Sequence, residues 1–152
     1  EGLLDRSTPA VLSANLERSG QPTGTLSGAW EKVRPWQLHD VGGFKVALVG
    51  LTTPGLASWL PPETLGGVLP TDPVAALQRS VTEARAEGAD AVVVIGHMGW
   101  RFRDNYSNPL RELLRNVRGV DVYLAGHSHQ NQPSFSLHDV LCSQASYYGI
   151  HC

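Results

Sequence analysis

Two segments of the sequence follow one pattern: an acidic residue, an apolar run, a glycine and then a histidine. The first runs from Asp90 to His97 and the second from Asp121 to His127. Uninterrupted apolar strands are typical of sheets covered on both faces, which are usually parallel. The two histidines are about thirty positions apart, which matches one strand–helix–strand unit. We therefore expect two parallel strands whose carboxyl ends meet at one edge of a sheet, where open α/β sheets bind ligands.

The segments that precede these two strands have helical periodicity. A first helix is predicted from Pro73, with Asp72 as its N-cap and Gly88 at its end. A second helix is predicted from Pro109 to Gly119. The resulting order of helix, strand, helix and strand is typical of an α/β fold.

Shorter elements are predicted elsewhere. The pair Gly42-Gly43 separates two partly alternating segments and predicts a hairpin over residues 33–50, in which Pro35 indicates an edge strand. The remaining predictions are a short buried strand over residues 9–15, a loop over 18–29, no regular element over 52–70, and two short strands over 139–150.

Composition limits the class of protein. The chain has 152 residues, of which 41% are hydrophobic and 17% charged, and its net charge is -2. These values predict a single domain with one sizeable core and exclude a disordered chain. The balanced charge excludes a basic nucleic-acid-binding surface. The longest apolar run, residues 91–95, is too short to span a bilayer.

The ends of the sequence and its cysteines give two further expectations. The sequence begins at Glu1 without a methionine or a signal segment and stops at Cys152 within a β-like stretch, so we expect a mature fragment or a piece of a longer protein. Cys142 and Cys152 are too few for a disulfide framework. A single pair and two free thiols both remain open.

Three histidines at one sheet edge indicate a metal site. Neutral imidazole is a common ligand for transition ions. His127 and His129 flank one small residue, so in an extended chain both rings point to the same side, and His97 is expected beside them. The alternative is that these histidines are polar strand ends that only form hydrogen bonds. A His-x-His-x-Asp-His hydrolase is set aside, because residues 130–132 lack its acid and its last histidine.

Other residues near this edge have open roles. Arg101 and Arg103 suit bidentate binding of phosphate, or they belong to a solvated loop and pair with Asp104. Trp59 is a candidate lid or packing anchor, and Asn15 ends a strand near the expected site. The remaining histidines are expected at the surface or at strand ends; they are His39, His138 and His151.

A set of motifs in a fixed order resembles a known family. Gly126-His127-Ser128-His129, with Gly96-His97-Met98-Gly99 upstream, is similar to the C-terminal half of the calcineurin-like metallophosphoesterase domain. The resemblance is strongest to its bacterial 5′-nucleotidase and 2′,3′-cyclic-nucleotide phosphodiesterase branch. Segments 9–15, 43–53 and 144–149 resemble further parts of that domain in the same order. The resemblance implies a partial four-layer α/β/β/α sandwich with mixed sheets, in which residues 1–152 form one partial domain.

The resemblance also implies a hydrolase with two divalent metal ions. In the family, the residues that match His97 and His127 bind one ion, and the residue that matches His129 binds the other. The ions, drawn from Mn, Fe, Co or Zn, bridge a hydroxide and hold a phosphate ester such as a nucleotide for in-line attack. The nucleotidase branch is mostly periplasmic or secreted, and the resemblance implies that location here.

The chain departs from the family in one large respect. The Asp-x-His, bridging Asp and Asn-His motifs of the family's first half do not occur before residue 97. The chain therefore contains no residue that matches a catalytic position, and alone it is expected to bind metal weakly and to turn over little or no substrate. The full-length parent is then the metal-dependent phosphoric ester hydrolase. Two alternatives remain: a degenerate domain with a binding or scaffolding role, and hydrolysis of thiosulfate esters, known in a sister branch.

Overall fold

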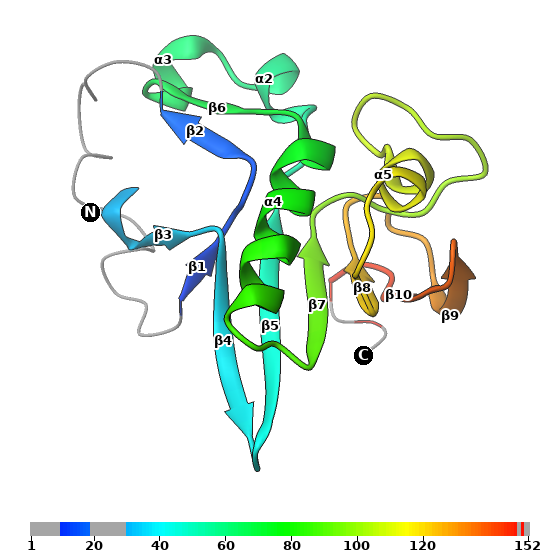
Figure 1. Cartoon of the computed structure of the whole chain (residues 1–152). Helices are drawn as coiled ribbons and strands as arrows, with labels where there is room; N and C mark the ends of the chain where they lie inside the picture. Colours follow the sequence, from blue (N-terminus) through cyan, green and yellow to red (C-terminus); the bar gives the residue numbers. More distant parts are fainter. Residues whose placement is uncertain (1–9, 19–29, 149, 151–152) are drawn as a thin grey trace.

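The computed structural model describes residues 10–18, 30–148 and 150. Its central feature is a mixed sheet of six strands (Figure 1). The four central strands are parallel to one another, and an antiparallel strand lies at each edge. In the order in which they lie in the sheet, the strands are β4 (Trp36–Val41), β5 (Phe44–Leu51), β7 (Ala91–Gly96), β8 (Val122–Ala125), β10 (Val140–Gln144) and β9 (Gln132–Leu137).

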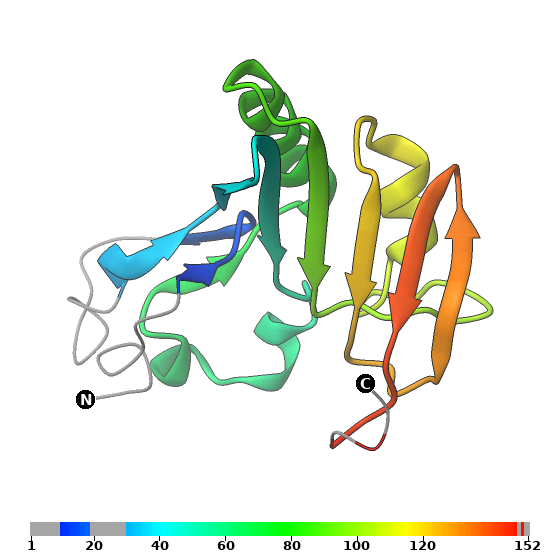
Figure 2. The same ribbon diagram turned by 90° about the horizontal axis from the view of Figure 1, so that it is seen from below.

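Two helices lie on one face of this sheet (Figures 1 and 2). Helix α4 (Pro73–Ala86) precedes β7, and helix α5 (Leu110–Asn116) connects β7 to β8. Asp72 caps α4, as predicted, because its carboxylate accepts a hydrogen bond from the Val74 backbone N–H at 2.9 Å. The core lies between the helices and the sheet, and its fully buried members include Val49, Leu77, Val92, Val94, Leu113 and Tyr123.

Helices α4 and α5 leave the opposite face of the central strands open. Ile95 in β7, Leu124 in β8 and Leu141 in β10 are 48%, 42% and 50% exposed. Side chains alternate between the two faces of a strand, so these three residues point away from the helices. A contiguous exposed apolar surface of this kind usually marks an interaction site.

The predicted α/β class with mixed sheets is confirmed, and so is the hairpin, although its first strand begins at Trp36 because Val33 and Arg34 pair with β1 instead. Strands β4 and β5 are antiparallel, and Val41 pairs with Phe44 across the turn. Gly42 and Gly43 have φ angles of 67° and 91°, which suits the two-residue turns that match strand twist. Strand β4 is an edge strand, as expected.

The predicted buried strand over residues 9–15 is shorter than expected. Strand β1 (Val11–Leu12) pairs with β3 (Val33–Arg34), and β2 (Leu16–Arg18) pairs with β6 (Val68–Pro70). Between β1 and β2, the buried Asn15 side chain donates to the Thr52 carbonyl and accepts from the Thr52 N–H, both at 2.8 Å. Asn15 therefore ties this segment to the end of β5.

The prediction that residues 52–70 form no regular element is wrong. Besides β6, the segment contains two short helices, α2 (Leu56–Trp59) and α3 (Pro62–Leu65). Pro62 occupies the first turn of α3, and Gly66, with φ of 55°, follows its end. Proline and glycine delimit these helices, which is their common placement.

Three smaller predictions also differ from the structure. Strand β9 was not expected, and residues 139–148 contain one strand instead of two; β9 is an edge strand whose apolar residues are sparse, so its pattern is weak. Helix α5 ends at Asn116, because Val117 is already extended. Most of the predicted loop over residues 18–29 lies outside the described residues, and Arg18 belongs to β2.

The Cys142 side chain is buried and has no disulfide partner among the described residues, and burial raises the pKa of its thiol to about 11. Cys152 lies outside the described residues, so the state of this pair of cysteines stays open. In the part of the chain that the structure describes, no helix has the length and apolar character needed to cross a bilayer.

Candidate metal centre

The carboxyl ends of β5, β7 and β8 meet at one edge of the sheet (Figure 1). His97 follows β7 directly, and His127 comes two residues after β8. The backbone pairing continues past the strands, since the His97 N–H donates to Leu51 O at 2.9 Å and the Gly126 N–H donates to Gly96 O at 3.1 Å. Backbone hydrogen bonds of the sheet therefore fix the position of the main chain at or next to both histidines.

The structure brings His97 and His127 into contact. His97 Nε2 and His127 Nδ1 are 3.2 Å apart, and the ring centroids are 4.9 Å apart at 58°. His97 is exposed and His127 is half-buried. Burial lowers the pKa of His127, and His97, Arg101 and His129 lower it further. The neutral form of His127, which is the form that binds metals, is therefore favoured.

The spacing of the two nitrogens fits a shared metal ion. Zinc–imidazole bonds are about 2.0–2.1 Å, so two imidazole nitrogens on one tetrahedral ion lie about 3.3 Å apart. The observed 3.2 Å agrees with this, and it is also the length of the N–H···N hydrogen bond that joins the two rings in this structure. His129 is not part of the contact: its ring packs against Tyr147 at 5.5 Å and Tyr148 at 6.1 Å between centroids. Among the described residues, no three His, Cys, Asp or Glu side chains form a group that could hold a metal.

The glycines before the two histidines differ in role. A Cβ on Gly96 would lie 1.9 Å from the Tyr123 hydroxyl oxygen, whereas one on Gly126 would meet nothing closer than His97 Nδ1 at 3.7 Å. Gly96 therefore makes room for the buried Tyr123 side chain. The unusual backbone belongs to His127 and His129, with φ of 71° and 56°. Left-handed non-glycine residues of this kind are concentrated at functional sites.

A buried polar cluster holds the loops on either side of the histidine pair. The Gln144 side chain is 1% exposed; its Oε1 accepts from Trp100 N at 2.8 Å, and its Nε2 donates to Ser128 Oγ and Gln130 O, both at 2.9 Å. The Ser128 hydroxyl in turn donates to Trp100 O at 2.9 Å. Ser128 lies between His127 and His129, so this cluster fixes the turn that carries both.

The sequence interpretation missed Gln144. A signal was present, because Val140, Cys142 and Gln144 share the inward face of β10. A polar side chain in an otherwise apolar inward register requires buried partners. The partners themselves come from loops far away in the sequence, and no local pattern identifies them.

Trp59 lies against the histidine pair. Its ring stacks on His127 with the centroids 4.9 Å apart and the planes at 24°, and its side chain is 49% exposed. It is absent from the hydrophobic core, whereas Trp36 and Trp100 pack against that core. Trp59 therefore lies outside the core and contacts the candidate site, and its role as a lid or a packing anchor stays a prediction.

Arg101 and Arg103 are exposed, and neither side chain forms a hydrogen bond or ion pair within the described residues. Asp104 does not pair with them; its carboxylate accepts from the Glu112 N–H at 2.8 Å.

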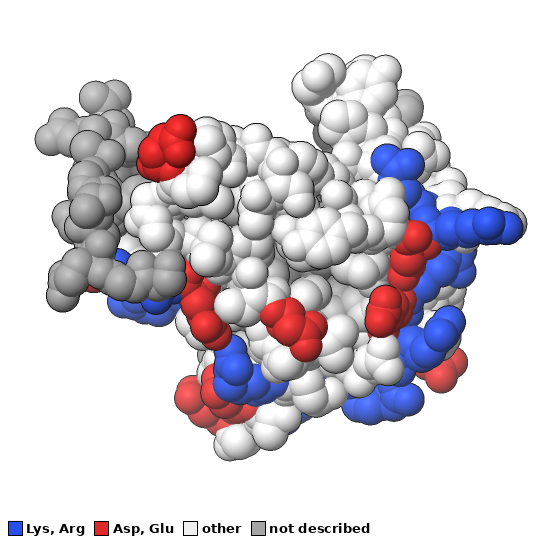
Figure 3. Space-filling model, turned by 90° about the horizontal axis from the view of Figure 1, so that it is seen from above, with Lys and Arg blue, Asp and Glu red and all other residues white. Residues whose placement is uncertain are grey.

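Seen from the end of the molecule where α2 and α3 lie, basic side chains gather along one side of the surface, and the centre of this view carries few charged side chains (Figure 3). His39 and His138 are exposed, as expected, and His151 lies outside the described residues.

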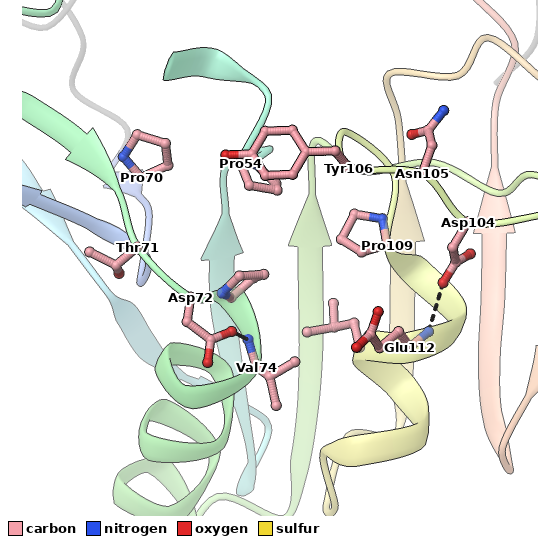
Figure 4. Close-up of a pocket in the computed structure, with 12 residues that line it drawn as sticks. Pro54, Pro70, Thr71, Asp72, Val74, Asp104, Asn105, Tyr106, Pro109 and Glu112 are labelled. Carbon is pink, nitrogen blue, oxygen red and sulfur yellow. Dashed lines mark hydrogen bonds between the residues drawn. The ribbon is translucent and has the colours of Figure 1, made fainter. Parts of the chain in front are cut away.

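A separate cavity of about 540 Å³ lies between the first turns of α4 and α5 (Figure 4). Its lining includes several prolines and the carboxylates of Asp72, Asp104 and Glu112. Two of these carboxylates accept hydrogen bonds from helix backbone N–H groups. None of the predicted metal ligands lines this cavity.

Comparison with known proteins shows which proteins the whole chain resembles. No protein-family model matches the chain. A 5′-nucleotidase of Diplobatis ommata is 34% identical over 137 residues, which make up 85% of this chain and 21% of that protein. The crystal structure of a 5′-nucleotidase precursor from Thermus thermophilus is 29% identical, with a TM-score of 0.72 over 94% of this chain and 29% of its own. The chain is homologous to 5′-nucleotidases.

Two further solved structures relate this nucleotidase homologue to neighbouring groups. The calcineurin-like phosphoesterase YfkN of Bacillus subtilis has a TM-score of 0.74 over 94% of this chain and 48% of its own, and at 18% identity it shows the shared fold. The sulfate thiohydrolase SoxB of Thermus thermophilus is 28% identical, with a TM-score of 0.71 over 89% of this chain and 22% of its own. The predicted family and fold class are confirmed, and the chain spans about a fifth of the curated nucleotidase.

Proposed function

We propose that this chain is part of a dinuclear-metal phosphoesterase that hydrolyses nucleotides or related phosphate esters. The observation that carries the proposal is the pair of imidazole nitrogens, from two different strand ends, that face each other at 3.2 Å. Homology to 5′-nucleotidases supports the substrate class. When bound, two divalent ions of Mn, Fe, Co or Zn supply Lewis acidity and an activated water for in-line attack on phosphorus.

The proposed roles of the three histidines follow the sequence motif. His97 and His127 hold one ion through Nε2 and Nδ1, which already face each other. His129 holds the second ion from the same turn. The exposed guanidinium of Arg101 is available to an anionic ester, because it has no partner within the described residues and acts electrostatically on His127.

We further propose that residues 1–152 are one part of a catalytic domain whose other part supplies the remaining ligands, including a bridging carboxylate. The described residues provide no third ligand beside the histidine pair. A groove of about 410 Å³ on the open sheet face is lined by Ile95, Leu124 and His97. A second sheet packed on this face would complete the four-layer sandwich and would place its own ligands next to His97.

The comparisons also support an alternative substrate class and a cellular location for the protein. The similarity to SoxB, at 28% identity, favours thiosulfate esters as the alternative substrate class. The similar Thermus thermophilus protein is named a 5′-nucleotidase precursor. A precursor form is typical of exported proteins, which supports a periplasmic or secreted location for this protein. A small-molecule ester is the proposed partner.

The test is phosphate release by the full-length protein from AMP and p-nitrophenyl phosphate in the presence of Mn²⁺. We expect turnover, and we expect His127→Ala to lose one equivalent of metal and nearly all activity. His39→Ala, which removes an exposed imidazole on β4, is the control and should have no effect. A fully active His127→Ala protein would refute the site. An inactive, metal-free wild-type protein would support the degenerate-domain alternative, and sulfate release from thiosulfate esters alone would support the second candidate.

A further inference from the structure

Trp59 is held against His127 by a segment with its own fixed contacts. It is the last residue of α2, which follows the end of β5. The Thr53 hydroxyl donates to Ser107 O at 2.8 Å and accepts from the Gly55 N–H at 3.1 Å. A Cβ on Gly55 would lie 2.6 Å from the Trp59 ring and 2.6 Å from the Ser107 hydroxyl. The start of α2 is thereby tied to the loop that follows His97.

Core packing does not explain this position of the indole. Helix α2 has no buried residue, and Trp59 is 49% exposed. Outside its own segment, the ring contact that the structure shows for the indole is the stacking on His127, at 4.9 Å and 24°.

His127 lacks the contact that usually orients a histidine ligand. Such a histidine normally donates its second ring N–H to a carboxylate, a carbonyl or water, which fixes the ring plane. Within the described residues, the one hydrogen bond of the His127 ring is that of Nδ1 with His97. The plane of the ring depends on the side-chain torsions of His127, which the backbone does not fix.

We propose that Trp59 is the positioning residue for His127. The face of the Trp59 indole fixes the plane of the His127 imidazole, so that Nδ1 of His127 is directed at Nε2 of His97. The indole also shields the stacked face of the His127 ring from water. Stacking here takes the place of the hydrogen bond that other histidine ligands donate from their second ring nitrogen to an orienting acceptor. This inference rests on the proposed function, since it takes His127 to be a metal ligand.

The test compares metal binding by Trp59→Phe, Trp59→Leu and Trp30→Leu in the full-length protein. Trp30 lines a different pocket, beside Ser13 and Glu83, and its loss removes the same ring away from the site. Binding of Co²⁺ or Mn²⁺ is followed by calorimetry and by quenching of tryptophan fluorescence, because a paramagnetic ion next to His127 quenches a stacked indole. Circular dichroism confirms that each variant is folded.

We expect Trp59→Phe to keep the affinity and stoichiometry of the wild-type protein but to lose most of the metal-induced quenching. Trp59→Leu should bind the ion about tenfold or more weakly, the usual effect of losing an orienting partner, while Trp30→Leu should match the wild type. Unchanged affinity in Trp59→Leu, together with lost binding in His127→Ala, would overturn the role of Trp59 alone. Unchanged binding in His127→Ala would overturn the proposed function instead.

Discussion

At the scale of single residues, the turn from His127 to His129 combines an unusual backbone with a buried clamp. Both histidines have positive φ, which costs of order 1 kcal/mol or more for a non-glycine residue. The Ser128 hydroxyl between them is bound by Gln144 and by Trp100 O. The histidines themselves were predictable from the motif. Their orientation was not, because it depends on contacts with residues 16 and 28 positions away.

Replacement of Gln144 by methionine tests this clamp. The change keeps the length of the side chain but leaves Trp100 N–H and Gln130 C=O without their buried partner, so we expect a loss of about 1–3 kcal/mol of unfolding free energy. Urea denaturation measures the loss. Gln37→Met, at an exposed position on β4, makes the same chemical change and should be nearly neutral. If the two variants lost equal stability, the clamp would have no energetic role.

At the scale of elements, the two strand ends look alike in the sequence but differ in packing. Both strands end in a glycine and a histidine, and this similarity correctly predicted that they are parallel neighbours. The reason for each glycine was not visible in the sequence. Gly96 faces the buried Tyr123 hydroxyl, whereas a Cβ on Gly126 would meet only ordinary van der Waals contacts, the nearest at 3.7 Å. The partner of Gly96 comes from the next strand, so only the register of the sheet reveals it.

Alanine substitutions at these two glycines should therefore differ. In Gly96→Ala, the new Cβ would lie 1.9 Å from the Tyr123 oxygen, and we expect overpacking to lower the unfolding free energy by about 1–3 kcal/mol. In Gly126→Ala, the nearest atom would be at 3.7 Å, which is an ordinary contact, and the effect should be small. Thermal denaturation of the two variants provides the comparison. A larger loss for Gly126→Ala would contradict the packing described for this edge.

At the scale of the whole molecule, apolar periodicity predicted the layers but not every strand. The helix at residues 73–86 and the strand at 91–96 were predictable because caps and a continuous apolar run define them locally. Strand β9 and helices α2 and α3 have short or sparse apolar patterns, so their formation depends on tertiary pairing. The open face around Ile95 and Leu124 could not be foreseen either, because burial depends on which elements cover a strand.

The most direct test of the account is an anomalous-diffraction map of the full-length protein crystallised with Mn²⁺. We predict one ion bound by both His97 Nε2 and His127 Nδ1, at about 2.0–2.3 Å from each, with a second ion near His129 and a carboxylate from outside residues 1–152 between them. A map in which the two rings still contact each other at 3.2 Å and every ion lies elsewhere would contradict the account.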